Sequence, residues 1–64
     1  MPMIQITLLQ GRTPEQKRKI AERITAVMAE EAGTKPEGVT ISFVEVSTAD
    51  YSSGGVLVLD RPKK

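Results

Sequence analysis

The sequence lacks cysteine, histidine and tryptophan, and it has only one Phe and one Tyr among 64 residues. Without cysteine it can form no disulfide, and without Cys or His it lacks the usual thiolate and imidazole ligands of zinc. Two aromatic rings are too few for the stacking platforms that bind single-stranded nucleic acid. We therefore expect no metal site and no nucleic-acid partner.

The sequence also lacks a large net charge and long apolar runs. Nine Lys and Arg against eight Asp and Glu leave a net charge of +1, too little to attract nucleic acid or an anionic membrane. No apolar run is long enough to span a bilayer. The start MPMIQI lacks the basic region and apolar stretch of a signal peptide. We expect a cytoplasmic protein with no membrane partner.

A chain of this length predicts a single small domain over residues 1–64. A domain of this size buries only about 60% of the surface that its unfolded chain exposes, so its own core is marginal. Small domains gain stability from disulfides, metals or partner chains. Because the first two are excluded, we expect oligomerisation.

The first part of the chain predicts a strand followed by a helix. Residues 3–9 (MIQITLL) are apolar and β-branched with polar interruptions, which is typical of a strand. Thr13 suits a helix N-cap, Pro14 the first helical position and Gln16 the third position of a capping box. A helix of about five turns is expected from here.

The predicted helix carries an apolar stripe that can pack on a sheet. Gly33 suits the residue after its end, and Pro36 prevents its continuation. The apolar residues of the stripe are Ile20, Ile24, Val27 and Met28, with Ala21 and Ala32 on or near that face. The charged residues expected mostly outside it are Lys17, Arg18, Glu22 and Glu30.

A second strand is predicted at 39–46 (VTISFVEV). Strand, helix and strand within roughly 45 residues predict the α/β (α+β) class, as a βαβ unit with parallel strands and a right-handed crossover. Residues 47–55 (STADYSSGG) predict a loop, 54–59 (GGVLVL) a short final strand or half-hairpin, and 60–64 (DRPKK) a polar tail.

Both predicted strands are apolar on two faces, although one helix covers only one face of a two-stranded sheet. In the first strand, Ile4, Ile6 and Leu8 lie on one face and Met3 and Leu9 on the other. In the second strand, Val39, Ile41 and Phe43 lie on one face and Val44 and Val46 on the other. We expect other subunits to cover the second face and to complete the sheet at its open edges. The alternative is that some of these residues are ordinary surface side chains.

Three residues stand out for chemistry once nucleophile–base pairs, phosphate-binding loops and metal clusters are excluded. They are Pro2, whose amine becomes free if Met1 is removed, Arg12 after the first strand, and Tyr51 in the long loop. Each has a plain alternative. Pro2 can be an ordinary second residue, Arg12 a solvated loop residue, and Tyr51 a packing residue at an interface.

The segments PMIQITLLQGRTPEQKRKI, VTISFVEV and DYSSGG resemble the 4-oxalocrotonate tautomerase family over nearly the whole chain. An N-terminal proline together with GRTPEQK at this spacing is a fairly specific signal, whereas either alone is weak. The resemblance implies a βαβ subunit with a short C-terminal hairpin, assembled as a homo-hexamer of three dimers. It also implies a cofactor-free enzyme of aromatic degradation that acts on a small carboxylate substrate, with the N-terminal proline as general base.

The resemblance also implies how a pocket around Pro2 is lined. Tyr51 stands where the family has a phenylalanine that forms an apolar wall; the tyrosine keeps the ring and adds a hydroxyl donor, so both roles are open. Leu9 is expected to line the same pocket, with plain interface packing as its alternative. A guanidinium such as that of Arg12 can stabilise an enolate or hold a substrate carboxylate.

The chemistry of a terminal amine is compatible with the base role. A free α-amino group has a reference pKa of about 7.7–8.0, and an apolar pocket or a nearby arginine lowers it. Such an amine can take a proton from the carbon next to a carbonyl and return it elsewhere. Pro2 and Arg12, however, lie at opposite ends of the first strand, roughly 26 Å apart at about 3.3 Å per residue. Arg12 would therefore act in the site of a neighbouring chain.

One departure from the family leaves the substrate open. Well-known members carry a second arginine early in the second strand, where this chain has Thr40, which supplies neither a fixed charge nor a bidentate fork. The substrate can be smaller or lack one carboxylate, Tyr51 or Arg61 can substitute in part, or a related chain can supply the arginine in a hetero-hexamer. A hydratase or dehalogenase of the same superfamily and a non-catalytic subunit are the alternative functions.

Overall fold

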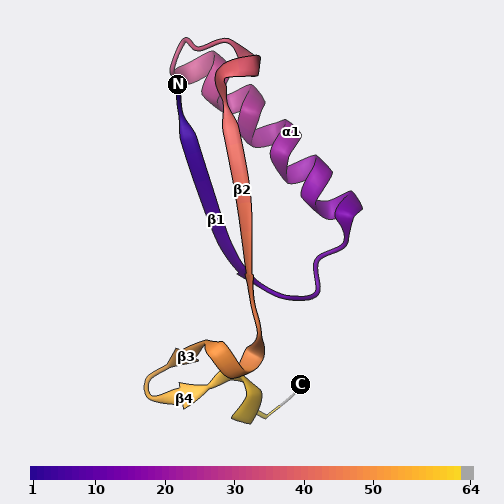
Figure 1. Cartoon of the computed structure of the whole chain (residues 1–64), viewed down its shortest axis with the longest axis vertical. Coiled ribbons are helices and arrows are strands. Elements are labelled where there is room, and N and C mark those ends of the chain that lie inside the picture. The colour runs from indigo at the N-terminus through magenta and orange to yellow at the C-terminus, as the bar shows by residue number, and fades with distance from the viewer. Residues whose placement is uncertain (63–64) are drawn as a thin grey trace.

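The computed structural model describes residues 1–62 and consists of a βαβ unit followed by a small hairpin (Figure 1). The elements are β1 (Met3–Leu9), α1 (Pro14–Glu31), β2 (Thr40–Val46), β3 (Ser52–Ser53) and β4 (Val56–Leu57), with 3-10 helices at Pro36–Gly38, Thr48–Asp50 and Val58–Asp60. β1 and β2 are parallel, and β3 and β4 are antiparallel. The predicted fold class, a βαβ unit with a short C-terminal hairpin, is confirmed.

The two long strands pair over their whole length. The register runs from Met3 opposite Thr40 to Leu9 opposite Val46. Two further backbone hydrogen bonds extend the ladder, one at each end: Thr40 N–H donates to the Pro2 carbonyl at 3.1 Å, and Gln10 N–H donates to the Val46 carbonyl at 2.9 Å. The chain on either side of β1 is therefore tied to β2 as well.

The start of α1 forms the predicted capping box. The Thr13 hydroxyl oxygen accepts from the Gln16 N–H at 3.1 Å, and the Gln16 side-chain oxygen accepts from the Thr13 N–H at 2.9 Å. Pro14 occupies the first helical position. At the other end, Gly33 has a φ of +66°, a left-handed conformation that glycine adopts without strain. Both predicted ends of the helix are confirmed.

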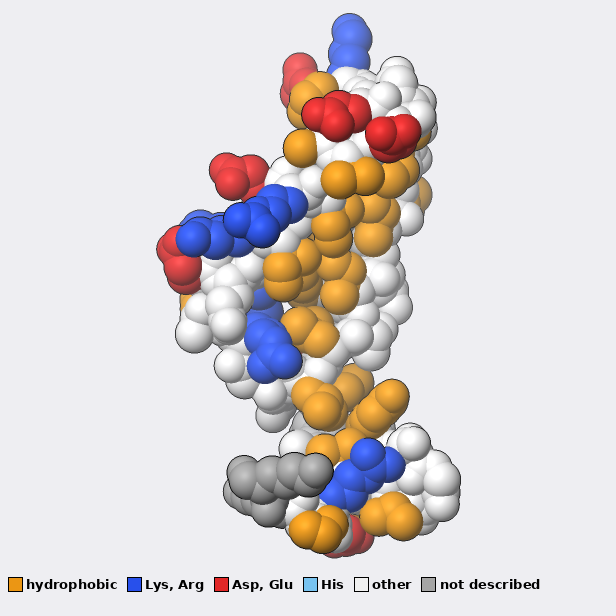
Figure 2. Space-filling model, turned by 180° about the vertical axis from the view of Figure 1, so that it is seen from behind, with side chains coloured by type: hydrophobic (Ala, Val, Ile, Leu, Met, Phe, Trp, Pro, Cys, Tyr) orange, Lys and Arg blue, Asp and Glu red, His pale blue; other side chains and the backbone are white. Residues whose placement is uncertain are grey.

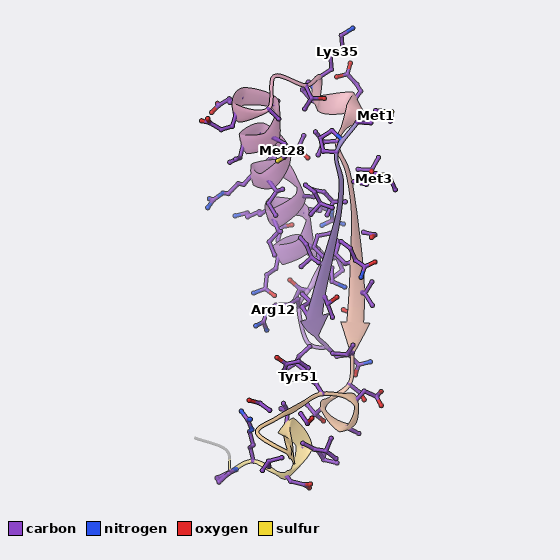
Figure 3. All side chains as sticks on the ribbon, turned by 90° about the vertical axis from the view of Figure 1, so that its left-hand side faces the viewer. Met1, Met3, Arg12, Met28, Lys35 and Tyr51 are labelled. Carbon is purple, nitrogen blue, oxygen red and sulfur yellow. The ribbon has the colours of Figure 1, made fainter. Side chains whose placement is uncertain are left out.

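One side of α1 packs toward the strands. Ile20, Ile24 and Met28 are half-buried, and Figure 3 shows Met28 on the strand-facing side of the helix. The prediction that Val27 belongs to this stripe is wrong in the isolated chain, because its side chain is 55% exposed. Residues step by about 100° around a helix, so Val27 lies roughly 100° from the centre of the half-buried face.

Lys17 also departs from the prediction, which placed it outside the apolar stripe. Its ammonium lies 2.5 Å from the Glu45 carboxylate and joins the first turn of α1 to the end of β2. The same helical geometry places Lys17 two turns before Ile24 on the strand-facing side. A lysine stem can cover apolar surface while its charged end reaches a partner.

The chain after α1 differs from the prediction in three places. β2 begins at Thr40 rather than Val39, because the Val39 N–H donates to the Pro36 carbonyl at 3.1 Å and ends a 3-10 helix. The predicted loop contains a strand at 52–53, since Gly54 and Gly55 have φ of +62° and +84° and form a tight turn with positive φ at both central positions. The predicted final strand shortens to 56–57, and residues 63–64 of the predicted tail lie outside the described part.

The isolated chain is elongated and has no closed core. None of residues 1–62 is fully buried. The accessible surface is 5190 Å², against about 4,000 Å² for a compact monomer of this mass. The radius of gyration is 15.1 Å, against about 11 Å for a compact chain of 64 residues. The fold therefore leaves much of its apolar surface open to solvent.

The open surface includes the side of the sheet that α1 does not cover. Met3 is 84% exposed and Val44 is 39% exposed. Figure 2 looks at the opposite side, on which α1 lies, and shows a long band of hydrophobic side chains there as well, with charged side chains beside it. One helix thus covers only one face of the sheet, as predicted. Within residues 1–62, no helix is long and apolar enough to cross a membrane.

Replacement of the N-cap residue should weaken α1 directly. Thr13→Ala removes the acceptor of the Gln16 N–H, so we expect the free energy of unfolding to fall by about 1 kcal/mol. The measurement is denaturant unfolding at one fixed protein concentration. Thr13→Ser, which keeps the hydroxyl, is the matched control. Equal stabilities of the alanine and serine variants would contradict a role for the cap.

Candidate active site

Pro2 lies at one end of the strand pair, immediately before β1. Its carbonyl accepts two hydrogen bonds from Thr40, one from the backbone N–H at 3.1 Å and one from the hydroxyl at 3.4 Å. Pro2 is half-buried, whereas Met1, whose carbonyl is bonded to the proline nitrogen, is 92% exposed. The bond between Met1 and Pro2 is therefore at the surface.

A shallow hollow lies beside this end of the sheet. Its lining residues are Met3, Ile4, Gln5, Thr40 and Ser42. None of these side chains is charged, and three of them carry hydroxyl or amide groups. The Pro2 end of one chain therefore offers hydrogen-bonding groups and apolar surface, but no cation among its lining residues.

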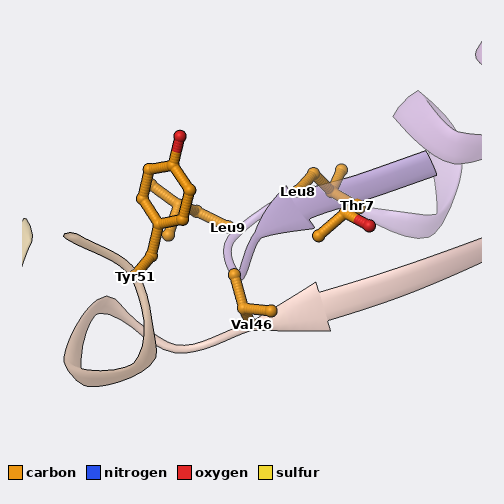
Figure 4. A pocket seen from close by; sticks show the side chains of 5 residues that line it. All are labelled: Thr7, Leu8, Leu9, Val46 and Tyr51. Atoms are coloured by element: carbon orange, nitrogen blue, oxygen red, sulfur yellow. The ribbon is translucent and has the colours of Figure 1, made fainter. Parts of the chain in front are cut away.

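A second pocket lies at the opposite end of the strands. Thr7, Leu8, Leu9, Val46 and Tyr51 line it, and Figure 4 shows the Tyr51 ring beside Leu9 with its hydroxyl pointing away from the strands. The Tyr51 side chain is 51% exposed, and its carbonyl accepts from the Val58 N–H at 2.9 Å. This bond ties Tyr51 to the start of the last 3-10 helix. The structure thus brings together two of the predicted site residues, Leu9 and Tyr51.

Arg12 lies near this second pocket. It follows Gly11, whose φ of +121° turns the chain away from β1 toward the helix. Figure 3 places Arg12 and Tyr51 toward one end of the strand pair and Met1 at the other. The Arg12 side chain is exposed, and within residues 1–62 it forms no ion pair. Its guanidinium is therefore available to an anion.

Within one chain, Pro2 is not brought to Arg12, Leu9 or Tyr51. The six residue steps from Met3 to Leu9 span about 20 Å at 3.3 Å per step. The strands are straight enough in Figure 1 that their two ends do not approach each other. The predicted site is therefore divided between the two ends of the strand pair, as strand length alone indicated.

Arg61 does not reach the Pro2 end either. Its guanidinium donates to the Ser53 carbonyl at 3.1 Å, within the hairpin region. Thr40 lies at the other end of β2. In one chain, Arg61 is thus placed to stabilise the hairpin and not to replace a cation at Thr40. A group of three or more acidic side chains that could hold a metal is absent from residues 1–62.

The contact between Thr40 and Pro2 was not predicted from the sequence, in which Thr40 stands out only as a position without arginine. The contact depends on the register of β1 against β2, which places Thr40 opposite Met3. A β-branched residue at the start of a strand was the only signal in the sequence, and it does not by itself predict a partner.

Solved structures define the class of this fold. A 4-oxalocrotonate tautomerase homologue superposes with a TM-score of 0.91 at 35% identity, covering 98% of this chain and all of the other. A heterohexamer 4-oxalocrotonate tautomerase from Chloroflexus aurantiacus J-10-fl superposes with a TM-score of 0.89 at 28% identity, covering 94% and 97%. The chain thus has the subunit fold of the 4-oxalocrotonate tautomerases.

Comparisons of the sequence agree with this assignment from the fold. The family model described as "Tautomerase enzyme" matches residues 2–61. A probable tautomerase of Bacillus cereus is 36% identical over 95% of this chain and all of the relative. The 2-hydroxymuconate tautomerase of Bacillus subtilis is 32% identical over 94% and 97%. The chain belongs to the tautomerase family, in its 4-oxalocrotonate tautomerase-like branch.

Proposed function

We propose that this protein is a cofactor-independent tautomerase that moves a proton α to a carbonyl in a small 2-keto or 2-hydroxy-dienoate acid. The general base is the amine of Pro2, freed by removal of Met1. The observation that carries the proposal is the place of Pro2. It is the first residue that the family model matches, it is held at the start of β1, and Met1, the residue before it, is exposed.

The proposed reaction needs one group that accepts a proton and returns it. From a 2-keto acid the unprotonated amine takes a proton from the carbon α to the carbonyl, and from a 2-hydroxy-dienoate it takes the proton of the 2-hydroxyl group. Either step leaves an enolate, and the resulting ammonium gives the proton to a carbon of the conjugated chain. The ring of proline restricts the motion of its nitrogen. The negative charge of the enolate and of the substrate carboxylate requires a cation close by.

Arg12 of a neighbouring subunit is the proposed cation. The distance within one chain excludes Arg12 of the same subunit, and the exposed guanidinium has no acidic partner within residues 1–62. Leu9 and Tyr51 lie toward the same end as Arg12 and would enter the shared site with it. A bidentate arginine–carboxylate contact would orient the substrate.

The oligomer that we propose is a homo-hexamer built from three dimers. Its support is the uncovered apolar face, the absence of fully buried residues in 1–62 and the divided site. Pairing two subunits side by side in opposite directions would bring the Pro2 end of each beside the Arg12 end of the other, which is an isologous contact of a two-fold dimer. The relative from Chloroflexus aurantiacus J-10-fl is a heterohexamer, so a second chain type is the alternative assembly.

The substrate class rests on the relatives and on the chemistry of the site. A relative of this chain is a 2-hydroxymuconate tautomerase, whose name specifies an unsaturated hydroxy acid. Arg12 provides one site for a carboxylate, and the residues lining the hollow at the Pro2 end provide no second cation. In a homo-oligomer, this favours a substrate with one carboxylate anchored by arginine and an uncharged or solvated remainder.

Replacement of Pro2 tests the base. With phenylenolpyruvate or 2-hydroxymuconate as substrate, Pro2→Ala should lower kcat/KM by at least about tenfold, since general-base catalysis contributes typically 10²–10⁴-fold and alanine keeps a less constrained amine. Intact-mass measurement must first establish removal of Met1 in both proteins. Pro62→Ala, at the far end of the described chain, is the matched control. Equal rates for Pro2→Ala and the parent protein would refute the proposal.

Mixed oligomers test whether the site is shared. Pro2→Ala and Arg12→Ala should each be nearly inactive alone. In randomly assembled symmetric oligomers of equal amounts, about a quarter of the sites combine an intact Pro2 with a neighbour's intact Arg12, so about a quarter of the activity should return. The measurement is the rate after co-refolding, with each variant refolded alone as control. No gain on mixing would place both residues in one chain or remove Arg12 from the site.

Native mass spectrometry tests the assembly. Six chains of 7.0 kDa give a particle of about 42 kDa. A single chain mass on dissociation of that particle would support the homo-hexamer, and a second chain mass in the complex from the native host would establish the heterohexamer instead. A particle of one chain would contradict both, because the divided site could not close.

A further inference from the structure

The carbonyl of Pro2 is the only part of that residue that the fold holds by hydrogen bonds among residues 1–62. Register pairing of β1 and β2 begins one residue later, with Met3 opposite Thr40. Thr40 nevertheless reaches back to Pro2 with two donors, its N–H at 3.1 Å and its hydroxyl at 3.4 Å. A carbonyl oxygen has two lone pairs, so these donors can occupy both.

The direction of that carbonyl sets the direction of the proline nitrogen. The five-membered ring fixes the nitrogen relative to the α-carbon. Once Met1 is gone, the remaining freedom of Pro2 is rotation about the bond between its α-carbon and its carbonyl carbon. Holding the oxygen fixes this rotation, and with it the lone pair that would accept a proton. Proton transfer requires this lone pair to point at the reacting carbon at close range.

The Thr40 hydroxyl supplements the hydrogen bond that the Thr40 backbone N–H donates to the Pro2 carbonyl. Hydrogen bonds at the end of a ladder open more readily than those in its middle. The Thr40 N–H lies at such an end, and both Thr40 and Met3 are exposed. A second donor from the same residue keeps the Pro2 oxygen in place when the first bond lengthens. The branched β-carbon of threonine restricts its side-chain rotation and so keeps the hydroxyl near that oxygen.

We propose that Thr40 is a positioning residue, whose hydroxyl orients the Pro2 amine by holding the Pro2 carbonyl. The proposal rests on Pro2 as the general base. It gives Thr40 a task in the isolated subunit that needs no charge and no contact with substrate. It also separates the role of this residue from the question of which cation binds the substrate.

The test compares two substitutions of Thr40. Thr40→Val keeps the branched shape and the strand preference but removes the hydroxyl, whereas Thr40→Ser keeps the hydroxyl. Thr48→Val, at an exposed threonine in the 3-10 helix Thr48–Asp50 that precedes the hairpin, is the matched control for a threonine-to-valine change. All proteins are compared after intact mass has established removal of Met1 and native mass has established the same assembly. If Thr40→Val does not assemble, Thr40→Ala replaces it.

The expected result is a selective change in kcat. We expect Thr40→Val to lower kcat by about three- to tenfold with KM within about twofold, because only the alignment of the base is affected. Thr40→Ser should recover most of kcat, and Thr48→Val should match the parent protein. An unchanged kcat in Thr40→Val would overturn the proposal. A rise in KM with kcat unchanged would also overturn it, since this would make Thr40 a substrate contact.

The Pro2→Ala variant separates failure of this proposal from failure of the proposed function. If Pro2→Ala is as active as the parent protein, the base is not Pro2, and both proposals fail. If Pro2→Ala is strongly impaired while Thr40→Val is as active as the parent protein, the proline base stands and only the role of Thr40 is refuted.

Discussion

The parallel pairing of β1 with β2 is the interaction on which the rest of this structure depends. Its register places Thr40 opposite Met3 and ties the carbonyl of Pro2 to β2. The same pairing requires a crossover, which α1 provides, and it leaves both strands with an open outer edge. The length of the paired strands also sets the distance between the two halves of the candidate site. One backbone feature thus organises both the fold and the proposed chemistry.

The exposed apolar surface and the divided site have a common solution. A single helix covers one face of the sheet, and the other face keeps side chains such as Met3 and Val44 in solvent. A free chain with this surface would be poorly stable, because apolar burial is the main favourable term in folding. A neighbouring subunit laid against that face would bury it and could bring its Arg12 end to the Pro2 end. Stability and activity would then arise from the same contacts, so a variant that weakens assembly should also lose activity.

Local signals in the sequence predicted the local structure well. Thr13, Pro14 and Gln16 indicated the start of α1 because a capping box needs only residues that are close in the chain. The two wrong predictions, for Lys17 and Val27, have a different cause. Lys17 was placed with the charged residues mostly outside the apolar stripe, yet its ammonium pairs with Glu45, 28 positions later. Val27 was assigned to the stripe by its type, yet the centre of the packed face lies elsewhere on the helix.

By itself, the sequence determined the order of the elements, the ends of the helix, the length of the first strand and hence the separation of Pro2 from Arg12. These follow from capping, periodicity and the fixed rise per residue, which are properties of neighbouring residues. Only the tertiary structure decided that Leu9 and Tyr51 share a pocket, that Arg61 bonds to Ser53, and that Thr40 holds the Pro2 carbonyl. Each of these contacts depends on strand register or on the path of the chain after β2. Neither the register nor this path can be predicted from the residue type at a single position.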